Sequence, residues 1–122
     1  MIHCKRVYDS ASPQDGKRVL VDRLWPRGIR KADLQMDEWC KDASPSTPLR
    51  QWYHQDMSQQ QEFRVRYMAE LAAHPEHCAT LLAHARAGDV TLLYGARDPV
   101  FNHALVLADY LRHQLQQSQE AL

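Results

Sequence analysis

The sequence is poor in the residues on which several common classes of protein depend. Only 4 of its 122 residues are glycine, and it contains neither a Gly-x-Gly-x-x-Gly nor a Walker sequence, which argues against a glycine-lined phosphate loop. Its 3 cysteines, Cys4, Cys40 and Cys78, are odd in number and widely spaced, so a disulfide framework is not indicated and free thiols are expected. No apolar run approaches the ~20 residues of a membrane span, and no secretory signal is recognisable. We therefore expect a cytoplasmic protein with no membrane partner.

Charge and size narrow the function classes further. The 15 Lys and Arg residues balance 15 Asp and Glu residues, so no global field attracts nucleic acid, and any electrostatic attraction has to be local. With 44% hydrophobic and 25% charged residues, the composition is that of an ordinary globular protein. The length fits one domain. We assign residues 1–115 to it and treat residues 116–122 as a polar C-terminal tail that frays.

Three apolar segments have the pattern of β-strands. Residues 2–8 alternate loosely, whereas residues 18–22 and 90–94 are nearly continuous apolar runs suited to burial on both faces. The segment 31–42 fits either a strand or a helix, and we weakly favour an edge strand. Gly28 is expected to take a positive φ in the turn after the second strand.

Four helices are expected between and after these strands. Thr47 with Pro48 can begin the first, and Ser58 can cap the second. A third is expected from Pro75 to a C-terminal cap at Gly88, and Asp98 with Pro99 would cap the last. This order of elements predicts an α/β protein with a small, mainly parallel sheet flanked by helices, a Rossmann-like layered single domain.

Several motifs, in order along the chain, carry a family resemblance. They are Arg18-Val19-Leu20-Val21-Asp22-Arg23-Leu24-Trp25-Pro26-Arg27-Gly28, Ala43-Ser44-Pro45-Ser46 with Leu49-Arg50-Gln51-Trp52, Phe63 to Leu71, and Leu92-Leu93-Tyr94-Gly95-Ala96-Arg97-Asp98 with Asn102-His103-Ala104. Together they resemble the YeaO-like family, a domain of unknown function, over about residues 4–111. The extra serine in the second motif departs from the family's alanine-proline-serine and leaves the register of that helix entry open. The resemblance implies a family and no activity.

Polar side chains follow the ends of two predicted strands, in residues 22–28 and 94–103. Ligands of open α/β sheets bind beyond the carboxyl ends of strands, so these segments lie where a site is expected. A helix beginning near Pro99 would offer free N–H groups to an anion, with Arg97 and His103 beside it. We therefore expect a phosphate or carboxylate ligand at this crevice.

Residue roles follow from this expectation. The acid–base candidates are Asp22, Asp98 and His103. The candidate substrate-binding residues are Arg23, Trp25, Arg27, Arg50, Tyr94, Arg97 and Asn102. The best hypothesis is a small enzyme without metal or organic cofactor that acts on a nucleotide or another phosphorylated molecule. The competing interpretation is structural: Asp98 caps the helix, Arg97 pairs with Asp22, and Asp22 accepts hydrogen bonds from the 25–28 turn.

The alternative function is a non-catalytic binding module, either for nucleic acid or for a small ligand that regulates a partner. The cations Arg23, Arg27, Arg30 and Lys31 surround Trp25, a combination that also suits nucleic acid. A solvated surface is the simpler explanation of these cations, and homodimerisation stays open. No metal site is expected from His74, His77, Cys78 and His84. On one helix His77 and His84 would lie two turns apart, and His74 would lie one turn from Cys78, which belongs to the apolar face. No second ligand pair with zinc-like spacing occurs elsewhere in the sequence.

Overall fold

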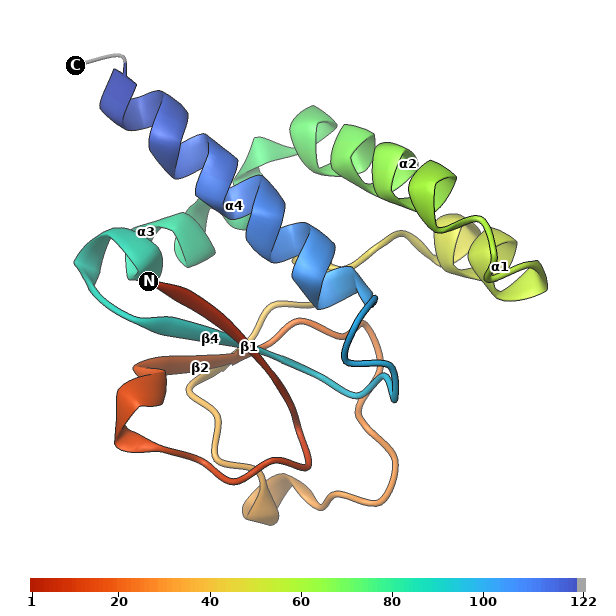
Figure 1. Cartoon of the computed structure of the whole chain (residues 1–122). Coiled ribbons are helices and arrows are strands. Elements are labelled where there is room, and N and C mark those ends of the chain that lie inside the picture. Colours follow the sequence, from red (N-terminus) through yellow and green to blue (C-terminus); the bar gives the residue numbers. More distant parts are fainter. Residues whose placement is uncertain (121–122) are drawn as a thin grey trace.

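The computed structural model describes residues 1–120 (Figure 1). In this range the strands are β1 (Ile2–Arg6), β2 (Lys17–Leu20), β3 (Glu38–Trp39) and β4 (Val90–Tyr94). They form one sheet in the order β1-β4-β2-β3, and each neighbouring pair is parallel. The predicted α/β class with a small parallel sheet is therefore confirmed. The carboxyl ends of all these strands lie at the same edge of the sheet, as parallel pairing requires.

The ambiguous segment 31–42 contributes a short edge strand. Residues 31–33 form a 3₁₀ turn, and β3 consists of only Glu38 and Trp39, paired with Val19 and Leu20 of β2. Asp37 guides this pairing, because its amide donates to the carbonyl of Arg18 and its carboxylate accepts the Arg18 amide. The preference for an edge strand was thus right, although the strand is shorter than its apolar pattern suggests.

The helices are α1 (Thr47–Gln55), α2 (Gln60–Ala73), α3 (Ala79–Ala87) and α4 (His103–Glu120). The first two begin with caps other than those predicted. Ser46, not Thr47, caps α1 through its Oγ, which accepts from the amide of Leu49. Gln59 precedes α2 without a side-chain cap, because Ser58 donates its hydroxyl to the carboxylate of Asp56 instead.

The start of α4 also differs from the prediction, and this difference moves a helix N-terminus. Asp98 does not cap α4: its carboxylate accepts from the amides of Val100 and Phe101 and closes a turn. The helix begins at His103, and the side-chain oxygen of Asn102 accepts from the amide of Leu105, 3.1 Å away. At its other end α4 continues to Glu120, so the predicted tail is helical up to that residue. Residues 121–122 lie outside the described part of the chain.

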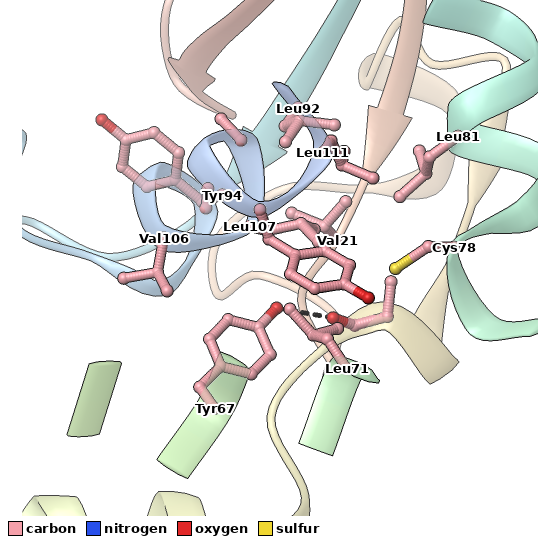
Figure 2. Close-up of a cluster of buried hydrophobic side chains, with 14 of the residues drawn as sticks. Val21, Tyr67, Leu71, Cys78, Leu81, Leu92, Tyr94, Val106, Leu107 and Leu111 are labelled. Carbon is pink, nitrogen blue, oxygen red and sulfur yellow. Dashed lines mark hydrogen bonds between the residues drawn. The ribbon is translucent and has the colours of Figure 1, made fainter. Parts of the chain in front are cut away.

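The main core lies between one face of the sheet and the helices (Figure 1). Figure 2 shows side chains from the strands, α2, α3 and α4 meeting there, and the dashed line marks the hydroxyl of Tyr67 donating to the carbonyl of Ala43. Tyr67 is completely buried, and this bond satisfies its polar atom. No helix in residues 1–120 is long and apolar enough to cross a membrane.

The other face of the sheet is covered mainly by an irregular segment. Leu20 and Leu93 point to this side and pack with Val7 and Leu34. Half-buried side chains of the segment complete this second cluster: Trp25, Ile29, Met36 and Trp39. The chain after β2 therefore passes the carboxyl edge of the sheet and then folds beneath it. As a result, Asp22 and Arg23 remain at that edge while Trp25 lies on the face opposite the main core.

Candidate functional site

A pocket of about 400 Å³ lies beyond the ends of β2 and β4, beside α1 and the start of α4. Its polar wall consists of Asp22, Arg23, Ser44, Arg50, His54, Arg97, Asp98, Asn102 and His103. Its remaining lining is Leu24, Pro45, Tyr53, Met57, Phe63, Ala96 and Phe101. The two polar segments singled out in the sequence therefore meet in one cavity, at the carboxyl edge where α/β folds place ligands.

Asp22 and His103 form the closest pair of titratable groups in this wall. Asp22 Oδ1 lies 3.1 Å from His103 Nε2, and each side chain is 17% exposed. Nε2 also lies 3.0 Å from the carbonyl oxygen of Val21. A carbonyl only accepts, so this contact requires a hydrogen on Nε2. Because this hydrogen serves Val21, Asp22 Oδ1 is a buried oxygen without a well-aligned hydrogen-bond partner among the described residues.

The second oxygen of Asp22 joins two strand ends. Oδ2 accepts from the amide of Gly95 at 2.8 Å, across the gap between the segments after β2 and β4. A Cβ at position 95 would stand only 3.0 Å from this oxygen, so glycine permits the close approach. In the structural interpretation of Asp22, its carboxylate was expected to accept hydrogen bonds from the amides of residues 25–28. It accepts instead from the amide of Gly95, which follows the neighbouring strand β4.

Three arginine side chains line the pocket without an acidic partner among the side chains that the structure describes. Arg23 is half-buried and donates from Nε to the carbonyl of Pro45 at 3.2 Å. Arg50 is half-buried and Arg97 is exposed. The arginine ion pairs within residues 1–120 involve Arg18, Arg30, Arg64, Arg66 and Arg112 instead. The alternative in which Arg97 pairs with Asp22 is therefore not realised.

An aromatic wall completes the pocket and was missed from the sequence. The ring of Tyr53 lies 4.4 Å from that of Phe63 and 6.2 Å from that of Phe101, measured between centroids. Burial, and then the charge of Asp98, raise the pKa of the Tyr53 hydroxyl, so it stays protonated and can donate, as it does to the carbonyl of Met57. Helical spacing could have indicated part of this wall, because Tyr53 and His54 follow Arg50 at i+3 and i+4 and therefore share its face of the helix.

Three of the predicted substrate-binding residues do not line the pocket. Trp25 packs on the other side of the sheet, with its indole N–H donating to the carbonyl of Ile29. The exposed side chain of Arg27 lies outside the lining. Tyr94 is only 4% exposed and belongs to the core beneath α4 (Figure 2). The alternation of side chains along β4 explains the last result, because residue 94 faces the helices with Leu92.

The basic turn also does not form one continuous surface. Arg23 lines the pocket, whereas the exposed Arg30 pairs with Asp33 and the ammonium of Lys31 lies 5.9 Å from the centre of the Trp25 ring. The cations that follow one another in the sequence are thus divided between the pocket and the surface below the sheet. This arrangement weakens the argument for a nucleic-acid ridge along residues 23–31.

A family model described as "Inactive DUF488-N3 subclade" matches residues 1–122. The chain is also 53% identical over 111 residues to the Escherichia coli protein named "Uncharacterized protein YeaO", which covers 91% of this chain and 96% of that protein. It is 43% identical over 114 residues to Mycobacterium tuberculosis "Uncharacterized protein Rv3073c" and to Mycobacterium bovis "Uncharacterized protein Mb3100c", covering 90% of this chain and 92% of each relative. No solved structure matches the chain significantly.

The fold and the pocket thus define a small parallel α/β domain with a polar cavity at its strand ends. This chain belongs to the DUF488-N3 subclade described as inactive and is a YeaO-like protein. The resemblance noted in the sequence is confirmed.

Proposed function

We propose that the pocket binds a small anionic molecule, such as a nucleotide or another phosphorylated compound, and that the protein is a non-catalytic binding module. The observation that carries the proposal is a set of arginines at one cavity, Arg23, Arg50 and Arg97, none of which has an acidic partner among the described side chains. A guanidinium presents a planar fork of donors that matches phosphate and carboxylate oxygens.

The aromatic wall supports a ligand with a flat apolar part. Tyr53, Phe63 and Phe101 form a continuous cluster on one side of the cavity. An aromatic ring or a nucleobase can pack against such side chains while its charged group reaches the arginines. The combination favours a nucleotide over a small inorganic anion.

The acid–base candidates support binding more strongly than catalysis. Asp22 accepts the Gly95 amide, Asp98 accepts two amides of its own turn, and His103 donates to the Val21 carbonyl. Each of these side chains therefore stabilises the backbone through a hydrogen bond. The description of the family as inactive agrees with this interpretation.

An enzyme acting on the same kind of ligand is the second candidate. It is favoured by the 3.1 Å contact between Asp22 and His103. A carboxylate beside Nε2 stabilises the imidazolium, so Nδ1 could accept a proton from a bound substrate.

We also infer a cytoplasmic location from Cys4, Cys40 and Cys78, all free thiols.

A thermal-shift screen tests the binding proposal. The purified chain is melted with nucleotides, phosphosugars, carboxylates and short oligonucleotides. A ligand at 100 times its Kd adds about 2.7 kcal/mol, which for a chain of this size raises Tm by about 10 °C. Arg50→Gln and Arg97→Gln should each reduce the shift. Arg86→Gln removes the same charge from an exposed position on α3 and should leave it unchanged.

The same screen separates the candidate functions. A small anion whose shift disappears in the two pocket variants supports the site, and NMR of the incubated ligand shows whether it is converted. Unchanged ligand with wild-type protein supports a binding module, whereas turnover that His103→Gln removes supports the enzyme. If only oligonucleotides stabilise the chain, with strong salt dependence, the pocket proposal is wrong.

A further inference from the structure

The turn between α2 and α3 brings two histidines together. α2 ends at Ala73, and Pro75 begins a 3₁₀ turn, η4 (Pro75–Cys78), before α3. The amide of His77 donates to the carbonyl of His74 at 3.0 Å. Side chains three residues apart are eclipsed in 3₁₀ geometry. The two imidazoles consequently stack, with ring centroids 4.9 Å apart and planes inclined by 14°.

Glu76 places a carboxylate oxygen beside both rings. Its Oε1 lies 3.2 Å from His74 Nδ1 and 3.8 Å from His77 Nε2. One potential ligand atom from each of the three residues lies within 4.8 Å of the other two. Ligand atoms bound tetrahedrally to zinc at about 2.0–2.1 Å are about 3.3 Å from one another. The 3.2 Å distance matches this spacing, and side-chain rotations on metal binding would shorten the others, which are at most 4.8 Å.

We propose that His74, Glu76 and His77 form a surface site for a first-row transition-metal ion, with Zn²⁺ as the ion that suits it best. Two imidazoles and one carboxylate are a ligand set that zinc accepts, whereas Mg²⁺ and Ca²⁺ prefer oxygen ligands. Three protein ligands leave a coordination position free for water or another molecule. This proposal is independent of the proposed function of the pocket.

The simpler explanation is a hydrogen bond between His74 and Glu76. It accounts for the 3.2 Å distance but not for the position of His77, whose Nε2 is too far from the carboxylate for a hydrogen bond at 3.8 Å. A shared ion requires the in-plane lone pairs of both imidazoles to converge on it, so the nearly parallel rings have to rotate when the ion binds. The 3₁₀ turn keeps one nitrogen of each ring near the carboxylate, within reach of such a rotation. The three groups are also accessible, because His74 and Glu76 are exposed and His77 is half-buried.

The site borders a second cavity of the fold. A groove of about 690 Å³ runs between the entry of α1 and the second half of α2, and both histidines belong to its lining. Glu70 and Arg66 line the same groove. Glu70 is engaged there with Ser46, whose amide and hydroxyl both donate to its carboxylate. A molecule in the groove would therefore lie beside both histidines of the proposed site.

The chain does not form the single helix on which the expectation of no metal site was based. On one helix the candidate ligand pairs would be His74 with Cys78 and His77 with His84. The chain instead leaves the α-helical conformation at His74 and re-enters it at Ala79, so His74 and His77 become neighbours. Cys78 is buried in the core, and His84 contacts Glu38.

Isothermal titration of the full, untagged chain with ZnCl₂ tests the site. We expect one equivalent of Zn²⁺ to bind and MgCl₂ to give no comparable heat. Glu76→Gln and His77→Gln should each weaken binding at least about 10-fold, because even outer-shell partners of a metal contribute that much. His113→Gln, an exposed histidine on α4, is the matched control and should bind like the wild type.

A second measurement identifies the ligands without any substitution. Imidazole NMR signals of the wild-type chain should shift for His74 and His77 on adding Zn²⁺. Absence of binding overturns the proposal. So does binding that survives in both Glu76→Gln and His77→Gln, since it would place the ion elsewhere, for example at His84 and Glu38 near the Cys40 thiol. Melting curves without metal confirm that the exposed-site variants are folded.

Discussion

The carboxylate of Asp22 joins the end of β2 to both the segment after β4 and the first residue of α4. One oxygen accepts the Gly95 amide at 2.8 Å, and the other lies 3.1 Å from His103 Nε2. Through this side chain the two polar segments of the sequence become one wall of the pocket. The pair is therefore central to the architecture of the pocket.

Asp22→Asn and His103→Ala should not have additive effects on stability. In Asp22→Asn, the side-chain oxygen can still accept from Gly95, but the new NH₂ group then faces the N–H of His103, and two donors meet. We expect a loss of about 2 kcal/mol, within the range for a buried donor left without a partner. Removing His103 removes the conflict, so a double-mutant cycle by urea unfolding should give a coupling of about 1 kcal/mol or more.

A matched cycle provides the control for this coupling. Asp109 on α4 binds Arg64 and Arg112 and has no hydrogen bond or ion pair with Asp22 in the described part of the chain. The effects of Asp22→Asn and Asp109→Asn should therefore add within about 0.5 kcal/mol. Additive losses for Asp22→Asn and His103→Ala would mean that their 3.1 Å contact contributes no interaction energy.

Trp25→Phe should reduce stability without changing the affinity of the pocket. The substitution removes the indole N–H that donates to the carbonyl of Ile29 and part of the packing of the ring against Trp39. We expect the free energy of unfolding to fall by about 1 kcal/mol. Trp52→Phe is the control, because the indole N–H of Trp52 has no hydrogen bond within residues 1–120. Chemical unfolding should therefore show the smaller loss for Trp52→Phe. A pocket ligand that binds Trp25→Phe more weakly would contradict the placement of Trp25.

The strands and the position of the pocket could be predicted because their signals are local. Residues 18–22 and 90–94 are nearly pure apolar runs, which identify strands buried on both faces. Parallel pairing then brings Asp22 and Arg97 to the same edge of the sheet without further information. Gly28 takes φ 79°, as its turn required.

Other features depend on competition between similar side chains or on the path of an irregular segment. Asp98 and Asn102 can both cap a helix, and the sequence alone does not choose between them. In the fold Asn102 is buried and donates its side-chain amide to the carbonyl of Asp98, which fixes the start of α4. Trp25 was placed in the site because it lies between two arginines, but the chain turns under the sheet before reaching it.

Acid should destabilise the protein partly through Asp15. Burial raises the pKa of this carboxyl, but hydrogen bonds from Lys5, the Ser12 amide and Arg18 outweigh burial and lower the pKa from 3.8 to about 2. A lowered folded-state pKa stabilises the fold above the unfolded value of 3.8, and this contribution is lost as the pH falls toward 2. Asp15→Asn should therefore flatten the stability profile between about pH 4 and pH 2.

The same variant should be less stable at neutral pH. The side chain of Arg18 is buried, with 9% of its surface exposed. Loss of the Asp15 carboxylate removes its ion-pair partner and should lower the free energy of unfolding by about 3 kcal/mol. Asp33→Asn, in an exposed pair with Arg30, is the control and should cost less than about 1 kcal/mol. Equal effects of the two substitutions on urea midpoints would show that Asp15 is not a buried partner.

The three thiols should react slowly with iodoacetamide in the folded protein. Burial is the largest cause that raises the pKa of Cys4 and of Cys78 to about 11, and burial followed by Glu38 raises that of Cys40 to about 12. The thiolate is the reactive form, so little of it exists at pH 7.5. Mass spectrometry should show rapid labelling only in denaturant. Fast native labelling of Cys78 would contradict its burial in the core.

Gly16→Ala should be among the most damaging single-methyl additions in this chain. Gly16 has φ 64°, and an added Cβ would stand 2.1 Å from the carbonyl oxygen of Asp89, so the backbone before β2 or β4 would have to move. At Gly28 the φ of 79° is also positive, but the added atom meets nothing within 4 Å. Gly28→Ala therefore measures the conformational cost alone, about 1–2 kcal/mol. Urea unfolding should show a clearly larger loss for Gly16→Ala, and equal losses would mean that the contact with Asp89 relaxes without cost.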